Sequence, residues 1–267
     1  MATIPAVLTI AGSDPSGGAG LQADLKVFHQ HSCFGCAVPA LLTVQNTQAL
    51  ARVEVLAPDL LCQQLDAVLQ DVPVAAAKTG ALGSSDNVRI VARRLARTRI
   101  PLVVDPVLTS TLGVPLSGSG VRRAMIEALL PCASLVTPNL KEAESLTGLS
   151  VRTTAQARDA ARALVDCGAQ AALVTGGHLE GAPVDVLLAG GHFHELVGRR
   201  IATRHAHGAG CTLSAAIAAR LARAEPMVEA VQRAKEWLTR ALATARGFGG
   251  GASGLNHLEP LIKTSER

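Results

Sequence analysis

Short apolar runs alternate along the chain with longer stretches in which hydrophobic residues recur every three or four positions. The run 5–10 ends in a turn-rich segment, and an amphipathic stretch at 19–31 follows it. Runs of the first kind predict strands and the spacing of the second predicts helices. The same alternation predicts further strands at 37–44, 74–78, 102–105, 134–137 and 171–174, and helices at 58–70, 85–97, 118–130, 140–147, 154–167, 209–223 and 226–246.

This alternation also predicts the fold class. Strands that are separated by helices favour a parallel sheet covered on both faces. The runs 184–188, 192–196 and 199–203 stand close together and predict an antiparallel meander at one sheet edge. We therefore expect an α/β fold with three layers (α/β/α), a mainly parallel central sheet and a short antiparallel edge. A single domain should span 1–267, with a glycine-rich, loosely packed tail at 247–267.

Composition narrows the class of protein. Hydrophobic residues make up 48% and charged residues 17%, which excludes disorder, and no apolar run approaches the roughly 20 residues that span a bilayer. The start of the chain has no basic side chain before its first apolar run and does not resemble a signal peptide, so we expect a cytoplasmic protein without a membrane partner. The six cysteines are then reduced thiols. Tyrosine is absent and the net charge is only +4, which disfavours nucleic acid as a partner.

The candidate site lies in the loops that follow the predicted strands. In sheets of this kind, ligands bind outside the carboxyl ends of the strands. Those loops are rich in glycine, proline and amide residues, and they are expected to meet at one crevice. They cover 12–18, 45–47, 79–80, 105–107, 138–142, 175–178 and 207–211.

The stretch HGAGCTLS at 207–214 joins one of these loops to an alanine-rich helix. Gly208 and Gly210 let successive N–H groups converge in front of the helix, where its dipole favours a phosphate. Cys211 stands in the first turn, where a thiol is expected to ionise more easily than in water. On these residues alone the alternative stays open: an ordinary loop followed by a small, buried and inert cysteine.

The sequences of these loops and their order along the chain resemble those of the ribokinase-like superfamily. Within it they are most similar to the hydroxymethylpyrimidine/phosphomethylpyrimidine kinases of thiamine biosynthesis. The resemblance covers nearly the whole chain. It rests on TIAGSDPSGGAGLQAD at 9–24, VQNT at 44–47, VDPV at 104–107, TPNLKEA at 137–143, GGH at 176–178 and HGAGCT at 207–212.

The resemblance implies transfer of the γ-phosphoryl group of ATP, with Mg²⁺, to 4-amino-5-hydroxymethyl-2-methylpyrimidine and then to its monophosphate. Phosphoryl transfer needs positioning and charge neutralisation more than covalent help. Gly208, Ala209, Gly210 and Cys211 would supply that neutralisation. Cys211 stands where most ribokinase relatives carry an aspartate, and it would accept the proton of the alcohol or chiefly position the hydroxyl.

Further roles follow from the same resemblance. Gln45 and Asp24, with Gly12 and Val107, would bind the pyrimidine, since a carboxamide both donates to and accepts from an aminopyrimidine. Thr175, Gly176 and Gly177 would contact the nucleotide, and Asp105, Asn139 and Glu142 would hold magnesium through hard oxygen ligands. The structural alternatives are a loop amide for Gln45, an exposed acid on the first helix for Asp24, and strand-end or helix-cap duty for the three metal candidates. His178 and His207 are taken as structural.

Three positions depart from the pattern of these kinases. Ala81 replaces a common methionine, Leu112 a serine and Thr175 a lysine. A wider pocket at Ala81 would admit pyridoxal or pyridoxine, so a vitamin B6 kinase is the main alternative. A cysteine hydrolase with Cys211 as nucleophile and His207 as base, and a non-catalytic pyrimidine sensor, are alternatives of other classes. The resemblance also suggests a homodimer.

Overall fold

The computed structural model describes residues 4–177 and 182–261, and within them nine strands form one sheet. The strands are short, and most of the central ones are wholly apolar, as expected of strands that are buried on both faces. They are β1 (Ala6–Ser13), β2 (Phe34–Gln45), β3 (Leu50–Val55), β4 (Val74–Thr79), β5 (Leu102–Val104), β6 (Leu135–Val136), β7 (Ala171–Val174), β8 (Val184–Ala189) and β9 (His192–Val197).

The strand order is β3-β2-β1-β4-β5-β6-β7-β8-β9. All pairings from β2 to β7 are parallel, whereas β3 pairs antiparallel with β2, and β8 pairs antiparallel with both β7 and β9. The sheet is therefore mainly parallel, as predicted, but both of its edges are antiparallel. The strand predicted at 199–203 is wrong, because this segment is irregular, and β3 was not predicted at all.

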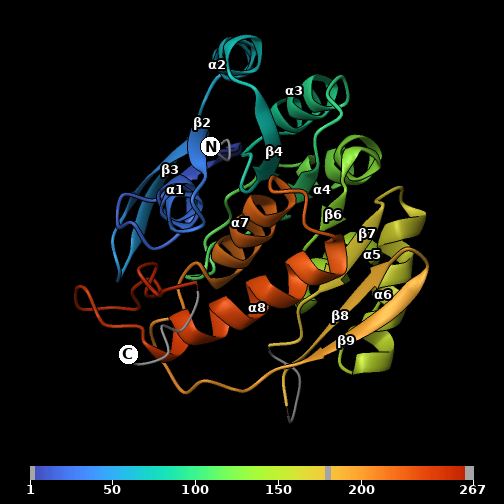
Figure 1. Ribbon diagram of the computed structural model, residues 1–267. Coiled ribbons are helices and arrows are strands. Elements are labelled where there is room, and N and C mark those ends of the chain that lie inside the picture. The colour runs from blue at the N-terminus through green and yellow to red at the C-terminus, as the bar shows by residue number, and fades with distance from the viewer. Residues whose placement is uncertain (1–3, 178–181, 262–267) are drawn as a thin grey trace.

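Helices cover both faces of the sheet (Figure 1). One face carries α1 (Gly20–Gln30), α7 (Ala209–Leu221) and α8 (Met227–Ala243). The opposite face carries α2 (Pro58–Asp71), α3 (Ser85–Leu95), α4 (Val121–Ala124), α5 (Leu140–Thr147) and α6 (Thr154–Asp166). The helix predicted at 118–130 is broken into α4, a π-helical turn η1 (Met125–Leu129) and a 3-10 turn η2 (Leu130–Cys132), the last of which contains Pro131.

Alternate side chains of each central strand feed two separate hydrophobic cores. In β5, Leu102 and Val104 pack on the side of α2 to α6, while Val103 packs on the side of α1, α7 and α8. All three are buried. Because successive side chains of a strand point to opposite faces, three consecutive apolar residues are what a three-layer fold needs at this position. The carboxyl ends of the parallel strands are thereby fixed at one edge of the sheet.

The described part of the C-terminal segment is exposed over 247–250, as predicted, but the residues after it pack against the protein, in contrast to the prediction for 247–267. Ser253, Leu255 and His257 are buried. The Trp237 indole N–H on α8 donates to the Glu259 carbonyl at 2.8 Å. This segment therefore folds back on the body of the protein as far as residue 261.

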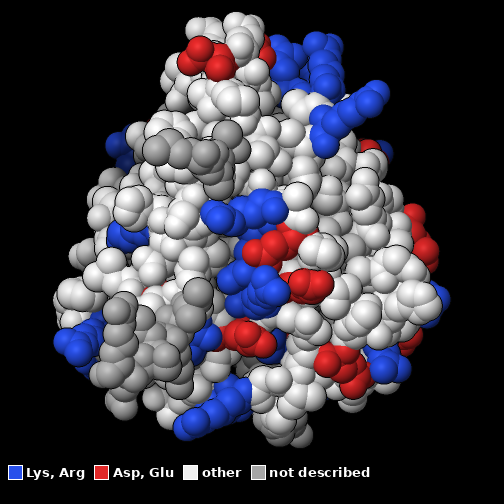
Figure 2. Space-filling view, in the orientation of Figure 1, with Lys and Arg blue, Asp and Glu red and all other residues white. Residues whose placement is uncertain are grey.

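The surface carries no large field of one charge on the face shown in Figure 2, where basic and acidic side chains are interspersed. On α8, Arg233 pairs with Glu229 and with Glu225, which keeps the local charge balanced. Within 4–177 and 182–261, no helix combines the length and the apolar character that crossing a membrane requires.

Candidate active site

Six parallel strands end at the same edge of the sheet and bring the predicted loops together there. Isolated bridges order these loops: Ser13 pairs with Gly20 across the loop after β1, and Asn139 pairs with Thr175, which joins the loops after β6 and β7. The start of α7 lies against this edge, since a side-chain carbon placed on Gly210 would lie 4.0 Å from both carboxylate oxygens of Asp105. The loop after β5 and the start of α7 therefore share one site, as predicted.

The turn that begins α7 requires glycine at Gly208. This residue caps the helix with φ of 79°, in the left-handed region, and a side chain there would collide with the backbone of Gly18 and Ala19. The Gly208 carbonyl accepts the Thr212 N–H at 2.8 Å, which is the first helical hydrogen bond of α7. The amides of Gly210 and Cys211 precede that bond and have no acceptor within the helix. They form the positive end of the helix dipole, so the predicted anion cradle has the right backbone geometry.

A fully buried lysine lies beneath this cradle. Lys78, near the end of β4, donates to both carboxylate oxygens of Asp24 at 2.9 Å, and its Nζ lies 3.9 Å from Asp105. Burial works against the charge of Lys78, but Asp24, Cys211 and Asp105 outweigh it and raise the pKa above the usual lysine range. Lys78 is therefore a fixed positive charge, which sequence reasoning missed.

Cys211 is a protonated thiol, contrary to the prediction that the helix terminus would favour ionisation. Burial raises its pKa to about 12, and the neighbouring carboxylates of Asp105 and Asp24 act in the same direction. Lys78 and the Gly20 amide act in the opposite direction without reversing the shift. The prediction was wrong because it weighed the helix dipole and neither the burial of the thiol nor the carboxylates beside it. A thiol in this state is a poor nucleophile at neutral pH, which disfavours the cysteine hydrolase alternative.

Two of the three predicted metal ligands are neighbouring carboxyl groups. Burial raises the pKa of Asp105, although Lys78 opposes the shift. Burial also raises the pKa of Glu142 to about 8, and the charge of Asp105 adds to this shift. Asn139 has the capping role that the sequence left open: its side-chain oxygen accepts the Glu142 N–H, and its own N–H donates back to the Glu142 carboxylate, both at 3.0 Å.

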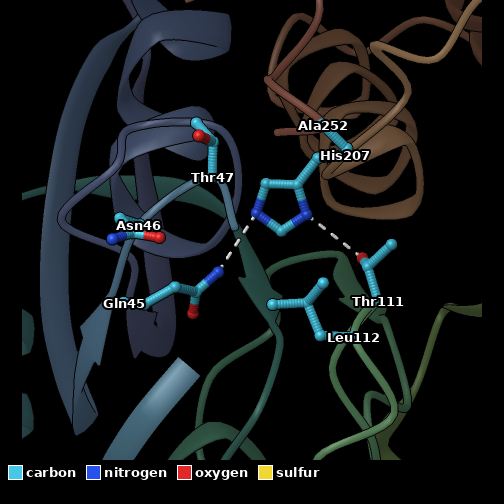
Figure 3. Close-up of a pocket in the computed structure, with 7 residues that line it drawn as sticks. All are labelled: Gln45, Asn46, Thr47, Thr111, Leu112, His207 and Ala252. Atoms are coloured by element: carbon cyan, nitrogen blue, oxygen red, sulfur yellow. Dashed lines mark hydrogen bonds between the residues drawn. The ribbon is translucent and has the colours of Figure 1, made fainter. Parts of the chain in front are cut away.

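Gln45 lies at the end of β2 in a small pocket (Figure 3). Its Nε2 lies 3.3 Å from Nε2 of His207, which in turn lies 2.9 Å from Oδ2 of Asp14. Because the His207 N–H that faces Asp14 leaves no lone pair on that nitrogen, an amide N–H of Gln45 finds no acceptor there. The carboxamide of Gln45 is thus weakly held and remains free to pair with a ligand.

His207 connects four segments of the site and is more than the isolated structural residue that the sequence indicated. Besides Asp14 and Gln45, it contacts the Thr111 hydroxyl, 3.1 Å from its Nδ1 (Figure 3). Burial works to raise the pKa of Asp14, but hydrogen bonds from His207 and Ser16 outweigh it and lower the pKa. An ionised Asp14 therefore holds the loop after β1 against the start of α7.

The other predicted substrate contacts do not line this pocket. Asp24 is fully buried on α1, where it accepts hydrogen bonds from Thr9 at 2.6 Å and from Lys78. It is neither an exposed acid nor an accessible ligand contact. Gly12 is buried beside Leu41 and Ala81, and Val107 is half-buried in the loop after β5. Ala81 is itself only 7% exposed, so the shorter side chain at this position does not open to solvent.

The predicted nucleotide loop Thr175, Gly176 and Gly177 follows β7 and is braced from behind. The Gly176 N–H donates to Asp185 of β8 at 2.8 Å. Lys235 of α8 pairs with the other oxygen of Asp185 at 2.6 Å. The Thr175 N–H bonds to the Pro138 carbonyl at 2.9 Å, which ties this loop to the one that precedes α5. His178 lies outside the described residues.

Comparison with known proteins gives this geometry its context. Residues 14–256 match the model of the family described as phosphomethylpyrimidine kinase. The chain belongs to this family. The predicted family is thereby confirmed, and members of it are phosphotransferases.

Individual relatives cover most of the chain. It is 42% identical over 261 residues to the hydroxymethylpyrimidine/phosphomethylpyrimidine kinase of Synechococcus elongatus, which covers 97% of this chain and 99% of that protein. It is 42% identical over 254 residues to the thiamine biosynthesis bifunctional protein ThiED of Geobacter sulfurreducens, which covers 94% of this chain but only 52% of that protein. This chain therefore spans about half the length of the bifunctional relative.

A solved structure confirms the ribokinase-like fold class. The pyridoxal kinase from Staphylococcus aureus in complex with ADP superposes with a TM-score of 0.90 at 33% identity, and the match covers 97% of this chain and 95% of that chain. Both the pyrimidine kinases and a B6 kinase thus share this architecture. The choice between their substrates depends on the residues of the pocket.

Proposed function

We propose that this protein transfers the γ-phosphoryl group of ATP to 4-amino-5-hydroxymethyl-2-methylpyrimidine and then to the resulting monophosphate. The observation that carries the proposal is the start of α7. There a glycine-lined helix terminus lies against Asp105, whose carboxylate is 3.9 Å from the buried Lys78, in a chain of the phosphomethylpyrimidine kinase family. Backbone N–H groups and a fixed cation suit a transition state whose charge is spread over phosphoryl oxygens.

Cys211 is proposed to position the hydroxyl group that is phosphorylated. Its thiol lies close enough to the Asp105 carboxylate to work toward lowering the pKa of that group, and the sulfur lone pairs can accept the O–H of an alcohol. Because the pKa of this thiol is about 12, a ready thiolate is not present to remove the proton early. We therefore place proton transfer late in the reaction, after most of the bond to the leaving group has broken.

Asp105 and Glu142 are proposed to hold Mg²⁺ together with the nucleotide. Both carboxyl groups have raised pKa values because they are buried; the charge of Asp24 adds to the shift of Asp105, and that of Asp105 adds to the shift of Glu142. A divalent cation would balance their charge. Within 4–177 and 182–261, no cluster of three or more His, Cys, Asp or Glu side chains is arranged to hold a metal ion. This fits magnesium, which usually takes one or two carboxylates and completes its shell with phosphate and water. The ion would neutralise charge on the transferred group.

The nucleotide is proposed to lie along Thr175, Gly176 and Gly177. Gly177 is exposed, and the amide of Gly176 is fixed by Asp185, so this loop offers a rigid backbone surface to phosphates or ribose. The S. aureus kinase was solved with ADP, which supports a nucleotide site in this architecture.

The second candidate function is a vitamin B6 kinase. The observation that favours it is the pyridoxal kinase from S. aureus, which is similar in structure and was also solved with pyridoxal. Ala81, Leu112 and Thr175 are the positions where this chain departs from the pyrimidine-kinase pattern. The two candidates share the phosphoryl-transfer machinery and differ in the ring that is accepted.

A substrate panel separates the candidates. ADP release is measured with magnesium and ATP for hydroxymethylpyrimidine, its monophosphate and pyridoxal in parallel. Turnover of both pyrimidines supports the proposal, whereas turnover of pyridoxal alone assigns the protein to the B6 kinases. Release of no ADP with any of the three rejects kinase activity toward these substrates and favours a pyrimidine sensor.

Two further predictions accompany this function. A homodimer is supported by the apolar residues that β2 exposes on its outer face, since Phe34 is 61%, Val44 59% and Leu42 45% accessible. Analytical ultracentrifugation tests it. A cytoplasmic location also remains a prediction, which fractionation of cells would test.

A further inference from the structure

The segment after α8 reaches across the substrate side of the site. We call residues 249–257 the C-terminal strap. The Gly251 N–H donates to the Thr47 hydroxyl at 3.1 Å, next to Gln45. The Ser253 carbonyl accepts the His207 N–H at 3.3 Å, and His257 Nε2 lies 3.0 Å from the Thr212 hydroxyl in the first turn of α7. The strap is therefore bonded to the loop after β2 and, at two points, to the start of α7.

Close packing of glycines locks the strap in place. A side-chain carbon on Gly254 would lie 2.7 Å from Cα of Gly18, and one on Gly18 would lie 3.1 Å from the Gly254 nitrogen. Gly208 also packs against the backbone of Gly18. The loop after β1 is thus held between the strap and the cradle, with no room for a Cβ at either contact. Ala252 lies between Gly251, which bonds to Thr47, and Ser253, which bonds to His207, so the backbone is fixed on both sides of it.

Ala252 lines the same pocket as Gln45. Figure 3 shows this pocket, whose other lining residues include Thr47, Leu112 and His207. Gln45 and His207 bring polar groups to it, whereas Ala252 and Leu112 are its apolar members. A planar aminopyrimidine presents polar ring edges and an apolar methyl group, and a pocket of this composition complements both.

We propose that the C-terminal strap is a wall of the pyrimidine site and that Ala252 is a specificity-determining residue that limits the size of the ring accepted there. The proposal rests on the proposed function and extends it to a segment that follows the last helix. Because the backbone on both sides of Ala252 is fixed, a larger side chain cannot be accommodated by moving the strap outward. It must project into the pocket and occupy space that the substrate needs.

The test is Ala252→Leu in the full-length protein. Dissociation constants for hydroxymethylpyrimidine are measured by titration calorimetry, and KM values are measured for the pyrimidine and for ATP. One methylene in a fitted pocket changes discrimination about tenfold or more, so we expect both constants for the pyrimidine to rise at least about tenfold, with KM for ATP nearly unchanged. A smaller rise in a folded variant, or an equal rise for ATP, overturns the proposal.

Two further variants serve as a control and as a second test. Leu258→Ala changes an 83% exposed residue just beyond the strap and should leave both constants unchanged. Thr47→Val removes the hydroxyl that anchors Gly251 while keeping the shape of the side chain, and it should also weaken pyrimidine binding selectively. Emission of Trp237, the single tryptophan, reports whether each variant has folded. If Ala252→Leu fails to fold, Thr47→Val decides: unchanged pyrimidine binding overturns the proposal.

Measurements on the wild-type protein distinguish failure of this inference from failure of the proposed function. If it binds the pyrimidine but releases no ADP, the kinase function fails while the calorimetric comparison still tests the wall. If it phosphorylates the pyrimidine and Ala252→Leu behaves like the wild type, only the wall is rejected. If the wild type binds no pyrimidine by calorimetry, both are rejected.

Discussion

Two buried lysine–aspartate pairs support the two halves of the site, and they differ in what surrounds them. Lys78 and Asp24 lie beneath the start of α7, with side chains that are 0% exposed. Lys235 and Asp185 lie behind the nucleotide loop, with side chains 14% and 10% exposed. In each pair a strand contributes one partner and a helix contributes the other, so the local construction is alike.

The difference lies in the remaining partners. Lys78 has a second carboxylate, Asp105, and the Cys211 thiol close by, so several charged or ionisable groups share one dry space. Asp185 and Lys235 instead spend their other hydrogen bonds on backbone groups, the Gly176 N–H and the Leu196 carbonyl. The first pair sets the electrostatic potential where chemistry is proposed, whereas the second sets the shape of a loop. Five predictions test this contrast.

Lys78→Met should have the largest effect. It leaves Asp24 and Asp105 buried without a cation, and removal of one partner from a buried pair typically costs about 3–5 kcal/mol of unfolding free energy. Loss of a fixed charge at the cradle should also lower kcat about 10²- to 10³-fold. Urea denaturation and steady-state kinetics measure the two effects. A variant that loses stability but keeps full kcat would show that Lys78 only balances charge.

Cys211→Ala should lower kcat with little change in the free energy of unfolding. The thiol is proposed to touch the reacting hydroxyl, so its loss should lower kcat by about 10²-fold or more, within the range for positioned acid–base groups. Unfolding free energy should change much less than in Lys78→Met, because no charge is left unpaired. Wild-type Cys211 should also react slowly with iodoacetamide at pH 7, given its pKa of about 12. Rapid alkylation there would contradict a protonated thiol.

Asp185→Asn should weaken the binding of ATP and leave the other kinetic constants nearly unchanged. An amide keeps an acceptor for the Gly176 N–H but gives up the ion pair with Lys235, so the loop should loosen without collapsing. We expect KM for ATP to rise about threefold to tenfold, which corresponds to roughly 1 kcal/mol, with kcat and KM for the pyrimidine nearly constant. A fall in kcat at constant KM would instead place Asp185 in the chemistry.

The pH dependence of stability should reveal the Asp105–Glu142 pair in the absence of magnesium and nucleotide. Because the pKa of Glu142 is raised from 4.5 to about 8, the folded state holds a proton that the unfolded state releases. Its contribution to unfolding free energy is fully present below pH 4.5 and is lost as pH rises through about 8. Glu142→Gln should flatten that decline, as measured by urea denaturation across pH. An equally steep decline in the variant would assign it to other groups.

An exposed ion pair provides the smallest expected effect and a baseline. Arg158 and Glu195 are 48% and 39% exposed and lie 2.8 Å apart on α6 and β9. Glu195→Gln should change unfolding free energy by less than about 1 kcal/mol and leave both KM values unchanged. A larger change would mean that the contrast between the two buried pairs cannot be interpreted from single substitutions.

The sequence predicted the fold well wherever hydrophobic periodicity is set by burial. The strands β1, β4, β5, β6 and β7 are largely buried on both faces, so their apolar runs stand out. β3 was not predicted because it is an exposed edge strand whose sequence, LARVEV, mixes polar and apolar residues. The residues 199–203 also mix polar and apolar side chains but form no strand, and no local pattern distinguishes the two cases.

The site was only partly predictable for a different reason. Loop residues could be placed at one edge of the sheet because parallel strands end together. Lys78 could not be singled out, because its partner Asp24 lies 54 positions earlier and nothing local marks either residue as buried. The pKa of Cys211 was mispredicted for a similar reason, since it depends first on burial and then on carboxylates that the tertiary fold brings close. Tertiary contacts, and not local motifs, decide these properties.

The most direct test of the central claim follows the phosphoryl group itself. Phosphorus NMR of the protein with magnesium, ATP and hydroxymethylpyrimidine should show a monoester signal that rises first and a diphosphate ester signal that replaces it, while ADP accumulates. The Cys211→Ala variant should form the same products much more slowly. Hydrolysis of ATP to free phosphate, with neither ester formed, would contradict transfer to the pyrimidine and with it the role assigned to the start of α7.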